Sequence, residues 1–246
     1  MVKKDFDSEK WALSFYGVVD ENFQVETDMF HLHIHRKNNI EKLAAQRGDG
    51  TLDIYIPCKW KIEKYQYQEK LRRLMLSEVK AQALRIFTTR TILYANRYCI
   101  PCKRIEMSTR GKYMGCCYAD RGLIKYNPWI ICTASKTYID YLVCHELAHF
   151  FQRGHGPAFW QIAERLYLGL DLSAPTSGQT IKQLRNDFVQ DKMLNLLKYW
   201  GQSSYLKEFY RNGSVKRKEQ LIIPNYIDSN DKRVQDGYYT TFAIRV

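Results

Sequence analysis

Four side chains within eleven residues have the types and the spacing for metal-dependent chemistry. His145 and His149 are four residues apart, Glu146 directly follows the first of them, and His155 comes after five further residues. On a helix, residues four apart lie on one face, so these two imidazoles can point at a single ion. Glu146 is turned by about 100° from His145, close to the ion but not forced to ligate it. A carboxylate in that position can take a proton from metal-bound water.

The flanking residues predict the helix that must carry this motif. Thr137, followed three residues later by Asp140, resembles a capping box at the start of the helix. Gly154 predicts its end, because glycine tolerates left-handed backbone angles. A turn there would bring His155 back over the helix as a third nitrogen ligand. Three protein ligands and one open position are typical of a catalytic zinc site.

The alternative is a helix with incidental histidines and an incidental glutamate, because motif matches include false positives. The chain has six histidines, and three of them lie in this one stretch. Downstream, Pro157 fits the first turn of another helix, which we expect from Ala158 to about Leu168. The order of helix, glycine and third histidine favours the metal site.

The stretch HELAHFFQRGHGPAFW, residues 145–160, resembles the active-site segment of the YgjP-like zinc metallopeptidases, which are relatives of the SprT-like proteases. Upstream, the sequence MGCC at residues 114–117 is similar to that family's WGSC segment, and residues 122–127 are similar to its strand ending in Asn. The first and third residues of MGCC depart from the family's Trp and Ser. The resemblance covers roughly residues 30–170.

This resemblance implies an α+β fold with a zincin-like metallopeptidase core. An antiparallel sheet would lie beside the HExxH helix, a long helix would precede that helix, and a C-terminal extension of helix and β-structure would follow. We expect residues 1–60 to form the N-terminal β-rich part, residues 61–172 the zinc metallopeptidase core and residues 179–246 the extension. The implied function is hydrolysis of peptide bonds by a zinc-activated water. The implied zinc ligands are His145, His149 and His155, and the implied general base is Glu146.

Alternating apolar residues predict β-structure in the first sixty residues. Residues 11–19 and 23–27 flank a turn signal, residues 30–35 alternate strictly, and residues 51–57 form another strand after a polar connection at 38–50. The family resemblance implies that the last two strands pair antiparallel. Three histidines share one face of the strand at 30–35, either as the exposed face of a half-buried strand or as a metal-binding row. They are His31, His33 and His35.

A long helix is predicted from about Gln66 to Asn96. Apolar residues spaced by four or seven form its stripe: Leu71, Met75, Val79, Ile86 and Leu93. Its basic residues do not fall on one face, which argues against insertion of this helix into a nucleic-acid groove. They include Arg72, Arg73, Lys80, Arg85 and Arg90.

Three short strands are predicted between the long helix and the motif, at residues 104–107, 114–118 and 123–126. This small sheet would lie beside the zinc helix, and its edge could receive an extended peptide by strand addition. Residues 114–118 are the expected rim. A further donor for the developing oxyanion is usual in such enzymes. The candidates are Tyr113, Tyr118 and Arg153.

Seven cysteines at irregular spacings indicate free thiols in a reducing compartment. No run approaches about 18 apolar residues, and no signal-like segment opens the chain, so we expect a cytoplasmic protein without a membrane span. Four cysteines could instead form a second zinc site or remain half-buried thiols on neighbouring strands. They are Cys99, Cys102, Cys116 and Cys117.

Residues 173–178 read as a linker, after which Thr180 and Gln183 resemble another capping box. An apolar stripe follows on the predicted helix and must be buried somewhere. Since the tail beyond it also contains strand-like segments, we expect the stripe to dock on the same chain. The stripe consists of Ile181, Leu184, Phe188, Leu196 and Trp200.

The net charge of +12 is unevenly spread along the chain. Residues 1–60 carry 8 Lys and Arg against 10 Asp and Glu, whereas residues 61–178 carry 18 against 9. This balance allows two kinds of partner, acidic peptide or protein substrates and nucleic acid, as well as a solvated basic surface. The second function that we consider is therefore a basic nucleic-acid-associated zinc module, or a protease acting on DNA-bound proteins.

Overall fold

The computed structural model describes residues 19–108 and 114–187. The strand predicted at residues 11–19, apart from Val19, lies outside these residues, as do Tyr113, most of the C-terminal helix and the whole tail. Within them the chain forms two sheets and a set of helices, in the α+β class that the sequence predicts. None of the helices in these two ranges is long and apolar enough to cross a membrane.

The first sheet has the strand order β1-β2-β4-β3. Its strands are β1 (Gln24–Glu26), β2 (His31–Lys37), β3 (Ala44–Arg47) and β4 (Thr51–Pro57). The strands predicted at 23–27, 30–35 and 51–57 are confirmed. The alternation in β2 also holds, because Leu32 and Ile34 are buried while the three histidines between and beside them are half-buried or exposed.

The predicted antiparallel pairing of β2 with β4 is wrong, because the two strands are parallel. The chain between them was expected to be a polar connection, but it contains β3, which pairs antiparallel with the outer side of β4. This extra strand reverses the chain once more, so β4 returns in the direction of β2. The four residues of β3 are mostly exposed and show no apolar alternation, which is why the sequence did not reveal the strand.

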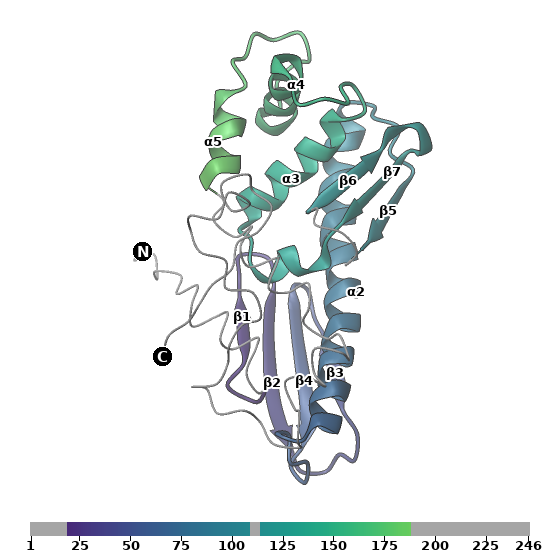
Figure 1. The fold of residues 1–246 in the computed structure, drawn as a ribbon, viewed down its shortest axis with the longest axis vertical. Helices are drawn as coiled ribbons and strands as arrows, with labels where there is room; N and C mark the ends of the chain where they lie inside the picture. Colours follow the sequence, from purple (N-terminus) through teal and green to yellow (C-terminus); the bar gives the residue numbers. More distant parts are fainter. Residues whose placement is uncertain (1–18, 109–113, 188–246) are drawn as a thin grey trace, which may run out of the picture.

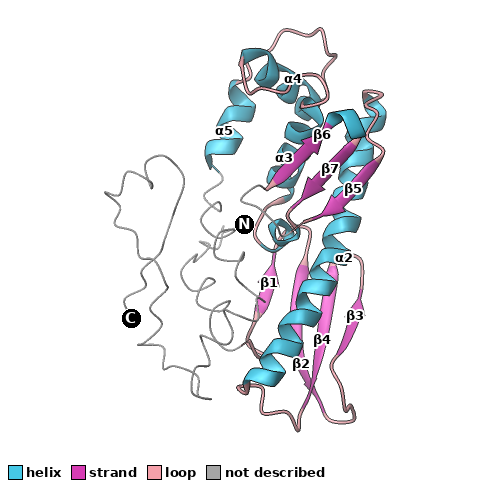
Figure 2. Ribbon diagram, turned by 45° about the vertical axis from the view of Figure 1, so that its right-hand side comes forward, coloured by secondary structure: helices cyan, strands magenta, loops and turns pink. Residues whose placement is uncertain are grey.

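Helix α2 (Tyr65–Arg97) runs along both sheets (Figures 1 and 2). At a rise of 1.5 Å per residue its 33 residues span about 50 Å. The predicted helix is confirmed, and four of its five predicted stripe residues are buried. Leu93 is 54% exposed, because the buried face follows the i+4 row through Phe87, Thr91 and Ala95.

The second sheet has the order β5-β7-β6, with β5 parallel and β6 antiparallel to the central strand. Its strands are β5 (Arg104–Met107), β6 (Gly115–Tyr118) and β7 (Leu123–Tyr126), which confirms the three predicted strands. A 3-10 helix, η1 (Ala119–Arg121), connects β6 to β7. The stacked rings of Phe87 and Tyr126, 4.2 Å apart, pack this sheet on α2. Strand β6 is left at the edge of the sheet.

The remaining helices complete the end of the molecule that contains the second sheet (Figure 1). They are η2 (Pro128–Cys132), α3 (Lys136–Ala148), α4 (Pro157–Leu168) and α5 (Gln179–Asp187). The Asn127 side chain accepts a hydrogen bond from the Trp129 N–H and so starts η2. Helix α3 is buried along most of its length between α2, α4 and the second sheet, and it carries the HExxH motif.

Candidate active site

Helix α3 begins two residues earlier than the predicted capping box. Ser135 is the N-cap, and its hydroxyl accepts a hydrogen bond from the Tyr138 N–H at 3.2 Å. Asp140 was expected to complete a cap with Thr137, but it points toward α2 instead. There its two carboxylate oxygens accept hydrogen bonds from Arg90 at 2.5 and 2.7 Å. This half-buried pair joins α3 to the long helix five residues before the motif.

The end of α3 also differs from the prediction. The helix stops at Ala148, and His149 is already its C-cap. The following residues form a tight turn, in which the Gln152 N–H donates to the Ala148 carbonyl at 3.0 Å. Gly154 does not have the predicted left-handed conformation; the glycines with positive φ in the described part of the chain lie elsewhere. The turn nevertheless carries the chain back, so that His155 lies against His145.

The three histidines converge on one point. His145 Nε2 and His155 Nε2 are 3.1 Å apart, and one ring nitrogen from each of the three residues lies within 4.8 Å of the others. Zinc binds histidine nitrogen at 2.0–2.1 Å, so two tetrahedral nitrogen ligands are about 3.3 Å apart. The spacing of His145 and His155 is close to that value. Three converging imidazoles are a donor set that zinc accepts.

Two hydrogen bonds orient the histidine rings. Tyr141 Oη lies 3.4 Å from Nδ1 of His145, one helical turn later, and the Gln152 carbonyl lies 3.0 Å from Nδ1 of His149. Each contact occupies Nδ1 and leaves Nε2 of that ring for a metal. Such partners fix the tautomer and the direction of a ligating histidine. Neither Tyr141 nor Gln152 was identified from the sequence.

The environment keeps these imidazoles neutral. Burial, together with the positive charges of His149, His155 and Arg185, lowers the pKa of His145 to about 3. Burial also lowers the pKa of His149 and of His155. A neutral imidazole has a free lone pair, which is the form that binds a metal.

Glu146 is only 3% exposed and lies between α3 and β6. Burial raises the pKa of its carboxyl to about 8, against the opposite effect of a hydrogen bond from the Cys117 N–H. The carboxyl group fits against β6 because residue 115 is glycine: a Cβ there would lie 2.5 Å from Glu146 Oε1. Gly115 was quoted in the family resemblance but was not recognised as part of the site. The signal that could have revealed it is a single glycine within a strand. Such a glycine often marks a place where another part of the chain or a ligand comes close to the strand.

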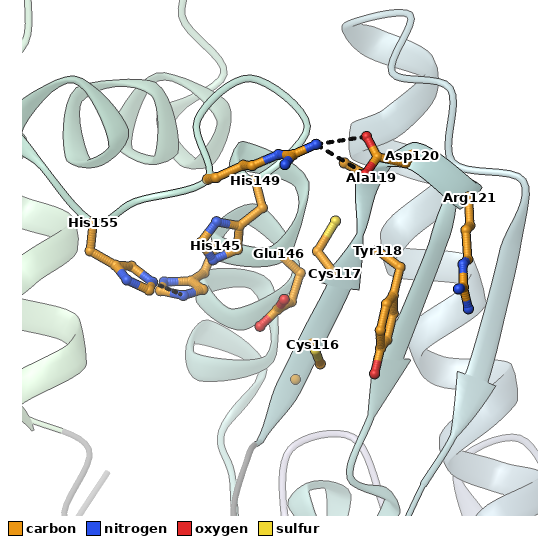
Figure 3. A pocket seen from close by; sticks show the side chains of 12 residues that line it. Cys116, Cys117, Tyr118, Ala119, Asp120, Arg121, His145, Glu146, His149 and His155 are labelled. Carbon is orange, nitrogen blue, oxygen red and sulfur yellow. Dashed lines mark hydrogen bonds and ion pairs between the residues drawn. The ribbon is translucent and has the colours of Figure 1, made fainter.

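The histidines and Glu146 open on a cleft of about 600 Å³ (Figure 3). Strand β6 and η1 form one wall, and α3 with the turn after it forms the other. Of the predicted oxyanion donors, Tyr118 and Arg153 line this cleft, but neither is directed at the histidines. Arg153 pairs with Asp120 at 2.9 Å, and the Tyr118 ring lies under the cationic groups of Arg121 and Lys125.

The residue that replaces the family's Trp contacts the motif helix. Met114 Sδ accepts a hydrogen bond from the Tyr138 hydroxyl of α3 at 3.0 Å. Met114 therefore joins the start of β6 to α3.

The other predicted metal sites do not form in the part of the chain that the structure describes. Its only group of three or more possible ligands that converge is the histidine triad. All seven cysteines are free thiols, and those of the proposed second zinc site do not converge. In the row on β2, His31 and His33 each hydrogen-bond Glu26 at 2.5 Å, and His35 hydrogen-bonds Asp53 at 2.7 Å. This row is the solvent-facing side of a sheet.

An α+β domain that brings three neutral imidazoles and a buried carboxyl group to the edge of a sheet has the features of a metal-dependent hydrolase. The model of the YgjP-like metallopeptidase domain matches residues 23–170, and the chain belongs to this family. A search of curated proteins and a search of solved structures gave no match.

Proposed function

We propose that the protein is a zinc-dependent peptidase, with His145, His149 and His155 as the zinc ligands and Glu146 as the general base. The observation that carries this proposal is the convergence of the three imidazoles beside a buried carboxyl group on one cleft. Bound zinc would polarise the scissile carbonyl and lower the pKa of water to about 7. A structural zinc site would have no evident use for Glu146, since this residue is not one of the converging ligands.

In this proposal Glu146 accepts a proton and later donates it. Its buried carboxyl group has a pKa of about 8 without a metal, so it ionises once a cation nearby favours the charged form. The carboxylate then takes the proton of the attacking water and passes it to the leaving amine. The Cys117 N–H and the space at Gly115 hold the carboxyl group in place for both transfers.

Peptides and proteins are the proposed substrates. Among the residues that the structure describes, strand β6 pairs with β7 on one side and has no strand on the other, and it borders the cleft. An extended peptide can add to that edge, which places a peptide bond beside the histidines. The free cysteines agree with the cytoplasm as the proposed compartment.

The nucleic-acid alternative stays a prediction that rests on the basic charge of the chain. Within the described residues, several of the basic groups near the cleft pair with carboxylates or lie over aromatic rings. Binding to duplex DNA that weakens steeply as salt is raised would favour this alternative.

The test of the proposed function separates metal binding from chemistry. Glu146→Gln keeps the size and polarity of the side chain and removes the base, so zinc content should stay near one ion per chain while hydrolysis of a protein substrate falls by about 10²–10⁴-fold. Glu106→Gln, on the far strand β5, is the matched control and should leave both unchanged. Unchanged hydrolysis by Glu146→Gln would rule out Glu146 as the base, and loss of zinc would make it a ligand.

A further inference from the structure

Helix α5 lies beyond the residues that match the family, yet it is firmly joined to the domain (Figure 2). Glu164 of α4 is 2% exposed and accepts hydrogen bonds from the Gly178 and Thr180 N–H groups, both at 2.7 Å. A carboxylate from the neighbouring helix therefore binds the first N–H groups of α5. This contact is made by Glu164 and not by the local capping box that was predicted at Thr180 and Gln183.

The start of α5 also packs closely on α4 and α3. Gly178 has a φ of +73°, and a Cβ there would lie 2.7 Å from Cβ of Trp160. Ile181 is completely buried, and Leu184 is partly buried against the same core, which confirms that this part of the predicted stripe docks on the chain itself. These contacts fix the direction of α5 at its first turn. They therefore also fix the position of the residue one turn after Ile181.

That residue is Arg185, and its side chain lies against Trp160, which in turn borders the histidine triad. Its guanidinium carbon lies over the Trp160 ring, 5.7 Å from the centroid. The Trp160 ring in turn lies 5.8 Å from the rings of both His145 and His155.

A guanidinium in this place is unfavourable for binding a divalent cation, because like charges repel. Arg185 is exposed, and none of the ion pairs among the described residues involves it. Apart from its contact with the Trp160 ring, its guanidinium is therefore open to an anionic group of a ligand bound beside the histidines. Arg121 and Arg153 also line the cleft, but Arg153 is paired with Asp120 and Arg121 lies over the Tyr118 ring. Within the described part of the chain, Arg185 is therefore the basic group near the histidines that remains for an anionic ligand.

We propose that Arg185 binds a carboxylate of the peptide substrate on the His155 side of the metal site. The inference rests on the proposed peptidase function and deepens it, because it names an acidic peptide as the preferred substrate. The carboxylate has two possible sources, an Asp or Glu side chain or the C-terminal carboxylate of the peptide. An extended chain advances about 3.3 Å per residue, so either group can reach Arg185 within a few residues of the cleaved bond.

The test measures binding in a protein that cannot turn over its ligand. The probes are fluorescently labelled hexa-alanine peptides with an amidated C-terminus and one Glu, placed at each position in turn, each with its matched Gln peptide. A Gln peptide with a free C-terminal carboxylate distinguishes the second source. Their dissociation constants are measured by anisotropy on zinc-loaded Glu146→Gln and on the same protein with Arg185→Gln.

We expect at least one carboxylate peptide to bind about 10- to 100-fold more tightly than its neutral match, and Arg185→Gln to remove that difference. Arg185→Lys should restore part of it, because lysine keeps the charge but not the bidentate geometry. Lys182→Gln is the matched control: it removes the same charge from the same helix and should preserve the preference. Zinc affinity of Arg185→Gln should be equal or higher, whereas a structural defect would lower it.

The outcomes separate this inference from the proposed function. Equal binding of the acidic and neutral peptides, no binding of either, or a preference that persists in Arg185→Gln would overturn the inference even if the wild-type protein hydrolyses peptides. An Arg185-dependent preference in a protein without hydrolytic activity would support the carboxylate site and contradict the peptidase.

Discussion

Gly115 on β6 and Glu146 on α3 form a contact that leaves no room for another side chain. A Cβ at residue 115 would lie 2.5 Å from Oε1, 2.7 Å from Cδ and 2.8 Å from Cγ of Glu146. The edge strand that borders the cleft is therefore also the wall that positions the proposed base. A displacement of β6 or α3 would therefore change the shape of the cleft and the position of the Glu146 carboxyl group at the same time.

The first prediction is that Gly115→Ala lowers activity without loss of metal. The added methyl group must push the Glu146 carboxyl group out of its place, and a misplacement of about 1 Å can cost on the order of 10²-fold in rate. Gly154→Ala is a matched control from the turn before His155, because a Cβ there meets nothing within 4 Å. Zinc content and kcat are measured for both variants. A fully active Gly115→Ala would show that the carboxyl group tolerates displacement.

The second prediction concerns the metal. His149→Ala should abolish stoichiometric zinc binding, because two imidazoles remain from a set of three. His35→Ala, on the solvent-facing side of the first sheet, should still bind about one zinc per chain. Elemental analysis after dialysis against a weak chelator gives the answer. Full zinc occupancy in His149→Ala would contradict the ligand assignment.

The third prediction concerns the orientation of a ligand. Tyr141→Phe removes the hydroxyl group that lies 3.4 Å from His145 Nδ1, and zinc affinity should fall by about 10-fold, the lower end of such effects. Tyr167→Phe, on α4 away from the triad, is the control. Zinc affinity is measured by competition with a chromophoric chelator. An affinity equal to that of the wild-type protein would mean that packing alone orients the His145 ring.

The fourth prediction is a pH dependence of the metal-free protein. The Glu146 pKa rises from 4.5 to about 8 on folding, so its contribution to stability is fully present below pH 4.5 and is lost as pH rises toward 8. The loss should amount to a few kcal/mol of unfolding free energy. The histidines act oppositely, because their lowered pKa values cost stability as pH falls below 6.5.

Urea unfolding of the chelator-treated protein at pH 5, 7 and 9 measures this effect. The difference between wild type and Glu146→Gln isolates the carboxyl group, because both proteins contain the same histidines. Glu146→Gln should be the more stable protein at pH 9. If the two curves run parallel from pH 5 to 9, the carboxyl group is solvated and not buried in solution.

The fifth prediction concerns the extension. A chain truncated after Gly178 should still bind zinc, but it should unfold at lower temperature and be less soluble, because the core surface under Ile181 becomes exposed. Ile181→Ala in the full chain should cost about 2–4 kcal/mol, as for other buried isoleucines. A truncated protein as stable as the full chain would show that α5 and the tail form an independent module.

The candidate metal ligands and the candidate general base were the most predictable part of the site. Helical spacing alone aligned His145 with His149, and no other sequence feature was needed to expect Glu146 beside them. The long helix α2 was also predictable. Its helical spacing of apolar residues continues over about thirty residues, whereas a short apolar run fits a helix or a strand equally well. The ends of α3 were predicted at the wrong residues. A serine two residues before Thr137 caps α3, and the tight turn at His149 ends it before any glycine.

Contacts between elements could not be predicted, because they depend on the tertiary fold. The sequence does not show that Asp140 faces Arg90, that Gly115 faces Glu146 or that Glu164 binds the start of α5. The strand β3 was missed for a related reason. It lies at the edge of its sheet with mostly exposed residues, so it has little apolar pattern.

The three converging histidines all come from residues 145–155, a stretch short enough that its ends meet at small entropic cost. The contact of Glu146 with Gly115, by contrast, joins segments 31 residues apart in the sequence and requires the second sheet. During folding, the local histidine cluster can therefore assemble before the wall of the cleft. If zinc binds as proposed, the metal site can form before β6 docks against α3 and completes the wall that holds the proposed base.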